Sequence, residues 1–139
     1  MDKNIFDRGL AIRKTVLGGA FVDRAFAAAD DFTMPMQELV TEYCWGAVWG
    51  RDGLEPRLRS MINLAMLSAL NRPRELEIHV RGALRNGVTP EEIREVLLQV
   101  AIYAGVPAGV EAFRIAGAVL AEETAIQSSG ADGTAAPRT

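Results

Sequence analysis

The chain contains a single cysteine, Cys44, and a single histidine, His79, among its 139 residues. One cysteine excludes an internal disulfide, a cysteine-based zinc site and a C-x-x-C redox pair, and it fits a reducing compartment. The first residues lead into no apolar core of the signal-peptide type, so we expect a cytoplasmic protein. Because Cys44 stands next to Trp45 in an apolar segment, we expect its thiol to be buried and unreactive.

Long apolar runs and an excess of basic charge are also missing. The longest apolar stretch, 96–110, is interrupted by Gln99, Gly105 and Pro107, and it is shorter than the ~20 residues that span a bilayer. The net charge is −3 with basic residues spread along the chain, which argues against nucleic acid or a membrane as a partner. Apolar residues still make up 49% of the sequence, enough for one folded domain with a core.

Apolar residues recur at helical spacing and strand-like alternation is nearly absent, so the predicted fold class is all-α. The firmest signal is Thr89-Pro90-Glu91-Glu92, a capping box with proline at the first helical position, which predicts a helix over 90–104. Asn86-Gly87 ends a preceding helix over 73–85. Further helices are expected within 1–30 with a break at Gly18-Gly19, over 33–49, from 56 to a break at 71–73, and from 107 to about 123.

These helices are expected to form one domain over residues 1–126. Residues 127–139 are small, polar and rich in glycine, proline and serine, which predicts a disordered tail. The helices between 56 and 123 carry wide faces of alanine, leucine and valine, which expose more apolar surface than a small bundle covers alone. We therefore expect a homo-oligomer.

His79 is expected on the helix over 73–85, where it shares a face with apolar residues and Glu75 lies one turn before it. A carboxylate at that spacing can orient the imidazole and raise its pKa, so that the ring donates a proton near neutral pH. A core histidine held by one hydrogen bond has the same spacing. The pattern alone leaves both interpretations open.

Glu38, Glu42, Trp45 and Trp49 are spaced by four, three and four residues, which places two carboxylates and two indoles along one face of an α-helix. Such a face can wall a pocket in which a poorly solvated carboxyl group acts as an acid or base. An ordinary amphipathic helix, with its tryptophans in the core and its glutamates in solvent, fits the same pattern.

Arginines crowd the same part of the sequence. A guanidinium group binds a carboxylate through two parallel hydrogen bonds, which would suit an acidic small molecule. Surface solvation explains these residues equally well. They are Arg51, Arg57, Arg59, Arg72, Arg74 and Arg81.

From about Phe6 to Glu123 the sequence resembles the carboxymuconolactone decarboxylase family, and within it the small bacterial gamma-carboxymuconolactone decarboxylases. The resemblance is carried above all by the long ordered run over 79–89, His-Val-Arg-Gly-Ala-Leu-Arg-Asn-Gly-Val-Thr. The other segments that match are 8–10 with Arg13, 42–46 with Trp49, 59–60, 64–67, 91–93 with Gln99, and 105–107.

The resemblance implies cofactor-independent decarboxylation of 4-carboxymuconolactone to 3-oxoadipate enol-lactone, a step of protocatechuate breakdown. This substrate is a butenolide with two carboxylates, and the electrons of the broken bond move through the ring double bond onto the lactone carbonyl. Because the substrate supplies its own electron sink, no metal or organic cofactor is required. The family is usually trimeric or hexameric, so the resemblance also implies a homo-oligomer.

The same resemblance, together with the helix geometry, suggests roles for the residues named above. His79, oriented by Glu75, would be the oxyanion donor or general acid, and Glu42 would handle a second proton. The expected substrate-binding residues are the indoles Trp45 and Trp49, as an apolar wall, and Arg72 or Arg51, on the carboxylate arm that does not react.

Other functions fit the same sequence. Peroxidase-linked members of the superfamily carry a glutamate, eleven residues, and then C-x-x-C-x-x-x-H. Ser60, Arg72, Glu75 and His79 stand at those positions here, so the dithiol chemistry is lost. A related enzyme that acts on another lactone or small acid, by decarboxylation or hydrolysis, and a non-catalytic helical oligomer that binds a ligand are the alternatives.

Overall fold

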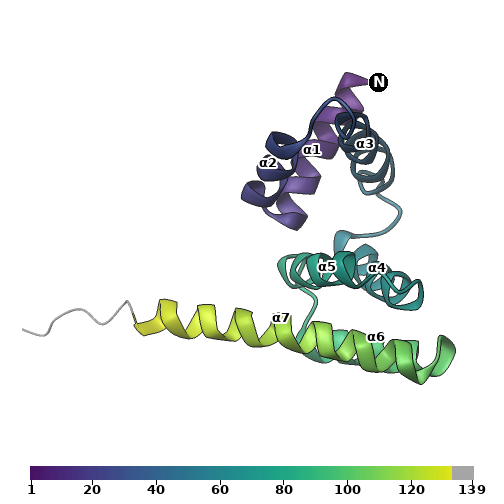
Figure 1. Ribbon diagram of the computed structural model, residues 1–139, viewed down its shortest axis with the longest axis vertical. Coiled ribbons are helices and arrows are strands. Elements are labelled where there is room, and N and C mark those ends of the chain that lie inside the picture. The colour runs from purple at the N-terminus through teal and green to yellow at the C-terminus, as the bar shows by residue number, and fades with distance from the viewer. Residues whose placement is uncertain (133–139) are drawn as a thin grey trace, which may run out of the picture.

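Glycines and prolines divide the chain into eight helical segments in the computed structural model, which describes residues 1–132 (Figure 1). No strand occurs within that range, which confirms the all-α prediction. The segments are α1 (Lys3–Leu17), α2 (Gly19–Ala28), α3 (Met34–Leu39), the π-helix η1 (Val40–Val48), α4 (Pro56–Ala69), α5 (Pro73–Arg85), α6 (Pro90–Tyr103) and α7 (Val106–Asp132).

Local signals in the sequence set most of these boundaries. The Thr89 hydroxyl accepts the backbone N–H of Glu92, and the Glu92 carboxylate accepts the backbone N–H of Thr89, each at 3.1 Å. This capping box confirms the predicted start of α6. Gly18 separates α1 from α2 with a φ of 92°, a conformation that glycine adopts without strain. The predicted break before α2 is therefore confirmed. The predicted break at 71–73 is confirmed as well, because α4 ends at Ala69 and α5 begins at Pro73.

The segment predicted as one helix over 33–49 differs from the structure. α3 passes directly into η1, where the Trp49 N–H donates to the carbonyl of Cys44, five residues earlier, at 2.9 Å. The wider π-helical turn lies where α1 approaches η1 closely. A Cβ atom at Gly9 of α1 would lie only 2.0 Å from the carbonyl oxygen of Thr41. Periodicity along one segment does not report such a contact between two helices.

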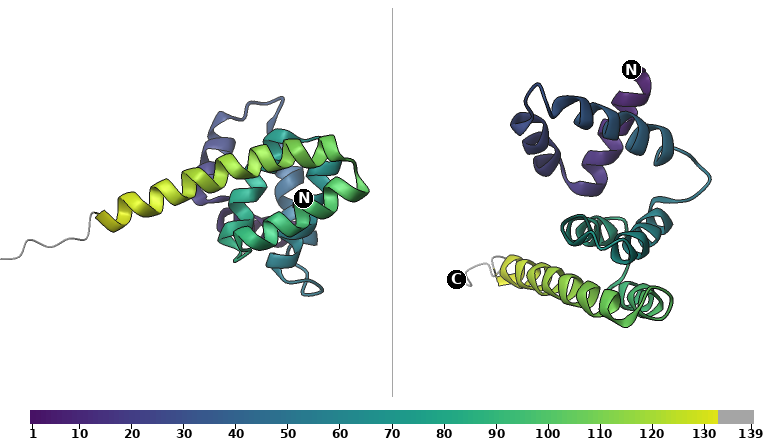
Figure 2. Two further views of the ribbon diagram at one scale, coloured as in Figure 1. Left: turned by 90° about the horizontal axis from the view of Figure 1, so that it is seen from below. Right: turned by 45° about the vertical axis from the view of Figure 1, so that its right-hand side comes forward.

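The last helix is longer than predicted. α7 begins at Val106 and continues to Asp132, so residues 127–132 of the expected tail are helical. Residues 127–132 are Gln-Ser-Ser-Gly-Ala-Asp, mostly weak helix formers, so their composition did not predict the extension. Figure 2 shows that this end of α7 projects beyond the other helices. Residues 133–139, the rest of the predicted tail, lie outside the described residues.

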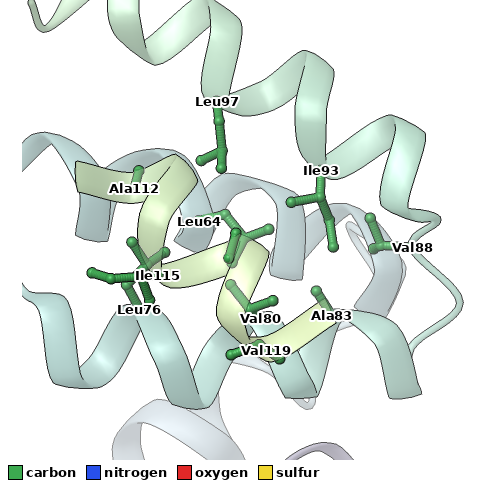
Figure 3. Close-up of a cluster of buried hydrophobic side chains, with 11 residues drawn as sticks. Leu64, Leu76, Val80, Ala83, Val88, Ile93, Leu97, Ala112, Ile115 and Val119 are labelled. Carbon is green, nitrogen blue, oxygen red and sulfur yellow. The ribbon is translucent and has the colours of Figure 1, made fainter. Parts of the chain in front are cut away.

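The helices are stacked in layers that enclose two hydrophobic cores (Figure 1). α4 and α5 form the middle layer, with α1, α2, α3 and η1 on one side and α6 and α7 on the other. The first core, here the N-terminal cluster, consists of Val16, Leu17, Val22, Trp45 and Trp49. The second, here the C-terminal cluster, is centred on Leu64 and is formed by α4, α5, α6 and α7, whose side chains point toward one another in Figure 3.

Helix α5 contributes to both clusters. Val80 and Ala83 are fully buried in the C-terminal cluster, while Ile78 packs against the N-terminal cluster. The end of α5 is tied to α1 by Arg85, whose guanidinium donates to the carbonyl of Val16 at 3.3 Å. The boundary between the two clusters, which we call the seam, therefore runs along α5.

No helix within residues 1–132 combines the length and apolarity required to cross a membrane.

Candidate functional site

The only histidine lies at the seam against Trp45. His79 is half-buried, and its ring lies parallel to that of Trp45, with 6.1 Å between the ring centroids and 2° between the planes. Trp45 in turn packs against Trp49 at 4.7 Å between centroids, and their exposed fractions are 2% and 7%. One side of the imidazole therefore faces an apolar aromatic wall, contributed by η1, while the ring itself comes from α5.

Asn63 on α4 contacts the other part of the ring. Its Nδ2 lies 3.4 Å from Nδ1 of His79, a long hydrogen bond between two half-buried side chains. The Asn63 amide is placed with its nitrogen toward the ring, and in this arrangement Nδ1 accepts and the neutral ring carries its hydrogen on Nε2. We did not predict Asn63 from the sequence. The sequence feature that could have identified it is an asparagine, a poor helix former, in the middle of an otherwise apolar stripe of α4.

Burial lowers the pKa of His79, and the charge of Glu75 raises it by a smaller amount. Glu75 therefore raises the pKa as expected, but burial outweighs it and the net shift is downward. Desolvation disfavours the imidazolium, while Glu75 is exposed, so water screens its charge. At neutral pH His79 is an uncharged ring with one N–H donor on Nε2. Such a group suits hydrogen bonding to a developing oxyanion better than proton transfer.

The predicted stripe of carboxylates and indoles is split by the π-helix. Glu42 is half-buried and faces the start of α1, where its carboxylate accepts the backbone N–H of Asp2 at 2.7 Å. Glu38 is exposed on α3, whereas Trp45 and Trp49 are core residues of the N-terminal cluster. The α-helical spacing that placed all four on one face does not hold here, because η1 has more residues per turn.

The two arginines expected to bind the unreactive arm are both exposed. Arg72 lines a cavity of about 280 Å³ together with Glu111 of α7, and His79 is not among the residues that line it. Arg51 follows η1, and its backbone carbonyl accepts a long hydrogen bond of 3.4 Å from the guanidinium of Arg59. Arg59 is half-buried, and its Nε is buried without a hydrogen-bond partner.

Two further features bear on what the site can do. Cys44 is exposed on η1, so the prediction that it is buried is wrong, but partial desolvation of its sulfur raises the pKa of the thiol, which agrees with the expected low reactivity. Within residues 1–132, no group of three or more His, Cys, Asp or Glu side chains is arranged to hold a metal ion. A third, larger feature is an apolar groove of about 580 Å³ between α4 and α6, whose lining includes Leu58, Ile62 and Tyr103.

Comparison with known proteins places these residues in a family context. Residues 35–118 match the family described as the carboxymuconolactone decarboxylase family, and that range contains His79, Asn63, Trp45 and Trp49. The chain is 45% identical over 112 residues to the nitrosuccinic acid decarboxylase of Metarhizium robertsii, covering 81% of this chain and 78% of that protein. It is 38% identical over 115 residues to the 4-carboxymuconolactone decarboxylase of Acinetobacter baylyi, covering 83% and 86%.

Proposed function

The chain belongs to the carboxymuconolactone decarboxylase family, and we propose that it removes carbon dioxide from a small dicarboxylic acid that carries its own electron sink. The substrates in the names of its two relatives share this chemistry. Each has two carboxylates, and one of them is attached to a carbon from which electrons can flow into an acceptor. The acceptor is the unsaturated lactone carbonyl in 4-carboxymuconolactone and the nitro group in nitrosuccinic acid.

The observation that carries the proposal is the imidazole of His79, stacked on the buried indole of Trp45 and contacted by Asn63. As the bond to the departing carboxylate breaks, its electron pair moves to an oxygen of the acceptor and carbon dioxide leaves. The Nε2–H of His79 would donate a hydrogen bond to that oxygen. A donor fixed in place before the reaction stabilises the developing charge without reorganisation of solvent.

The remaining groups would support this step. The indoles of Trp45 and Trp49 provide a poorly solvating surface, which disfavours the charged carboxylate relative to neutral carbon dioxide. One proton must then be added to carbon to complete the product, and Glu42 is our candidate to handle it. Glu75 lies within electrostatic reach of His79 and would tune its pKa rather than touch the substrate. No cofactor is needed for these steps.

We propose 4-carboxymuconolactone as the substrate, which would give 3-oxoadipate enol-lactone in aromatic catabolism. Nitrosuccinic acid is a second candidate, because the relative named for it is 45% identical to this chain, against 38% for the lactone enzyme. The test is to incubate purified protein with each acid at neutral pH and to measure carbon dioxide release and the ultraviolet spectrum of the product. The higher kcat/KM identifies the substrate. Release from neither acid, or ring opening without carbon dioxide, would contradict the proposal.

We also propose that the chain forms a homo-oligomer, a trimer or a hexamer. Support comes from large apolar side chains around the end of α6 and the start of α7, where Ile102 and Tyr103 are 79% and 85% exposed. These residues adjoin the apolar groove between α4 and α6. Apolar surface of this kind is more often covered by a second subunit than left in water. Light scattering should give a multiple of the 15.0 kDa chain mass, and a Tyr103→Glu variant should shift it downward.

A further inference from the structure

The arginines of the described chain differ in whether a carboxylate already occupies them. Arg57 is paired with Glu92, Arg81 with Glu77 and Glu122, and Arg114 with Glu111. These guanidinium groups are engaged in structural ion pairs, and they are poor candidates for a substrate carboxylate.

Arg13 lacks an acidic partner but is enclosed. It is 6% exposed, and its terminal nitrogens donate to Thr41 and Gln37 in the contact between α1, α3 and η1. A ligand would have to separate these helices to reach it. Arg13 is therefore a structural residue of the N-terminal cluster.

Arg59 combines partial burial with unused hydrogen-bonding capacity. Its Nε is buried without a partner, and a terminal nitrogen makes only the long 3.4 Å contact to the carbonyl of Arg51. Within residues 1–132 it forms no salt bridge. A buried polar N–H without a partner costs free energy, which a ligand that accepts its hydrogen would recover.

The position of Arg59 connects it with the candidate site. It lies one helical turn before Asn63, so the two side chains leave the same face of α4, and Asn63 contacts His79. Arg51, whose carbonyl it contacts, lies in the loop after η1, two residues after Trp49. The guanidinium thus lies between α4 and the loop that follows η1, and α4 and η1 supply the neighbours of His79.

We infer that Arg59 binds the carboxylate that the substrate keeps, the role that we had predicted for Arg51 or Arg72. The inference rests on the proposed function, since both candidate acids retain one carboxylate on a short arm after carbon dioxide leaves. The Nε and one terminal nitrogen of a guanidinium form a fork that matches the two oxygens of a carboxylate. A bound arm would replace the long contact to the Arg51 carbonyl and give Nε a partner.

The test compares Arg59→Gln and Arg59→Lys with Arg74→Gln, a control that removes an exposed charge from α5. Arg59→Gln should raise KM for the dicarboxylate on the order of 10- to 100-fold, with a smaller change in kcat, because a charge-assisted pair of hydrogen bonds is lost. Arg59→Lys should lie between the wild type and Arg59→Gln. Arg74→Gln should match the wild type. An unchanged KM in Arg59→Gln would overturn the inference.

A substrate with its retained carboxylate capped as an amide separates binding from a structural role. Capping should weaken the wild type to the level of Arg59→Gln and leave Arg59→Gln itself nearly unaffected, because the two changes remove the same interaction. If capping weakens both proteins equally, Arg59 does not contact that carboxylate and the inference fails.

Binding of 3-nitropropanoate, which keeps only the arm and the nitro group, tests Arg59 without turnover. Calorimetric titration should show binding to the wild type and to Arg74→Gln, and a loss on the order of 10-fold or more in Arg59→Gln. This result would support the arm site even if neither acid released carbon dioxide, which would contradict the proposed function alone. Equal binding by Arg59→Gln, or none by the wild type, would overturn the inference.

Discussion

The two hydrophobic clusters are packed in different ways. In the N-terminal cluster, backbones touch: a Cβ at Gly9 would lie 2.0 Å from the Thr41 carbonyl oxygen, and one at Gly46 would lie 2.3 Å from that of Ile5. In the C-terminal cluster, aliphatic side chains such as Leu64 fill the space between helices. The tight approach on that side, between Gly109 of α7 and Ala101 of α6, meets a side-chain methyl group first rather than a carbonyl oxygen. Trp45, which stacks on His79, therefore stands on η1 where contact between backbones fixes the spacing to α1.

The largest effect is expected for Gly9→Ala, in the contact between α1 and η1. The added methyl group would collide with backbone atoms that cannot rotate away, and we expect a loss of about 4 kcal/mol or more in the free energy of unfolding. Circular dichroism and thermal melting should show little folded protein. Gly117→Ala, on α7 with open space around it, is the matched control and should be neutral or slightly stabilising. Similar melting of both variants would contradict the rigid contact.

Truncation of a leucine in the C-terminal cluster should lower the free energy of unfolding without preventing folding. Leu64 is 0% exposed, and Leu64→Ala should lower the free energy of unfolding by about 2–5 kcal/mol, through lost burial and a residual cavity. Chemical denaturation measures this loss. We expect the variant to stay folded, and Leu64→Met to retain most of the stability. Loss of folded protein in Leu64→Met would show that the C-terminal cluster is as intolerant as the N-terminal one.

Removal of the imidazole should affect the seam more than either cluster. His79→Ala should reduce kcat by roughly 100-fold or more, about 2.7 kcal/mol, if its N–H stabilises the oxyanion. The free energy of unfolding should change much less, because the ring is half-buried and joins no core cluster. Steady-state kinetics and denaturation of the same preparation test both statements. Turnover within a few-fold of the wild type would refute the role of His79.

Asn63→Leu should have a smaller effect on the same reaction. Without the amide, Nδ1 loses its donor and the ring can rotate or exchange its tautomer, so we expect kcat to fall by about 5- to 10-fold. A structural role alone would change stability without changing catalysis. Asn63→Gln, which keeps the donor on a longer side chain, should recover part of the activity. A kcat for Asn63→Leu equal to that of the wild type would remove Asn63 from the site.

The smallest expected effect is on the pH dependence of stability. Burial lowers the pKa of His79 in the folded chain, so between this pKa and its ordinary value of about 6.5 the unfolded chain binds more protons. Stability should therefore rise as pH increases through that window and level off above it. The wild type should lose stability relative to His79→Gln on acidification. The same titration predicts a kcat that rises to a plateau, whereas a kcat that falls over this window would identify the imidazolium as the active form.

Features encoded by neighbouring residues could be predicted from the sequence. The capping box of Thr89 and Glu92 and the proline starts of α4 and α5 act within one turn, so those boundaries were found. The π-helix was not, because it accompanies contact with α1, which is distant in sequence. For His79, the helical face and the upward effect of Glu75 on its pKa were predicted, but the larger downward effect of burial was not. Spacing indicates which groups are near, but desolvation depends on the whole fold.

The pairing of Trp45 with Trp49 has a spectroscopic consequence. They are the only two tryptophans in the chain; Trp45 lies beside His79, and Trp49 packs against Trp45. The intrinsic indole fluorescence of the folded protein therefore originates entirely at the candidate site. Protonation of the imidazole or binding of a ligand at the seam would change this emission. Tryptophan fluorescence of the unlabelled protein can therefore be used to follow both events.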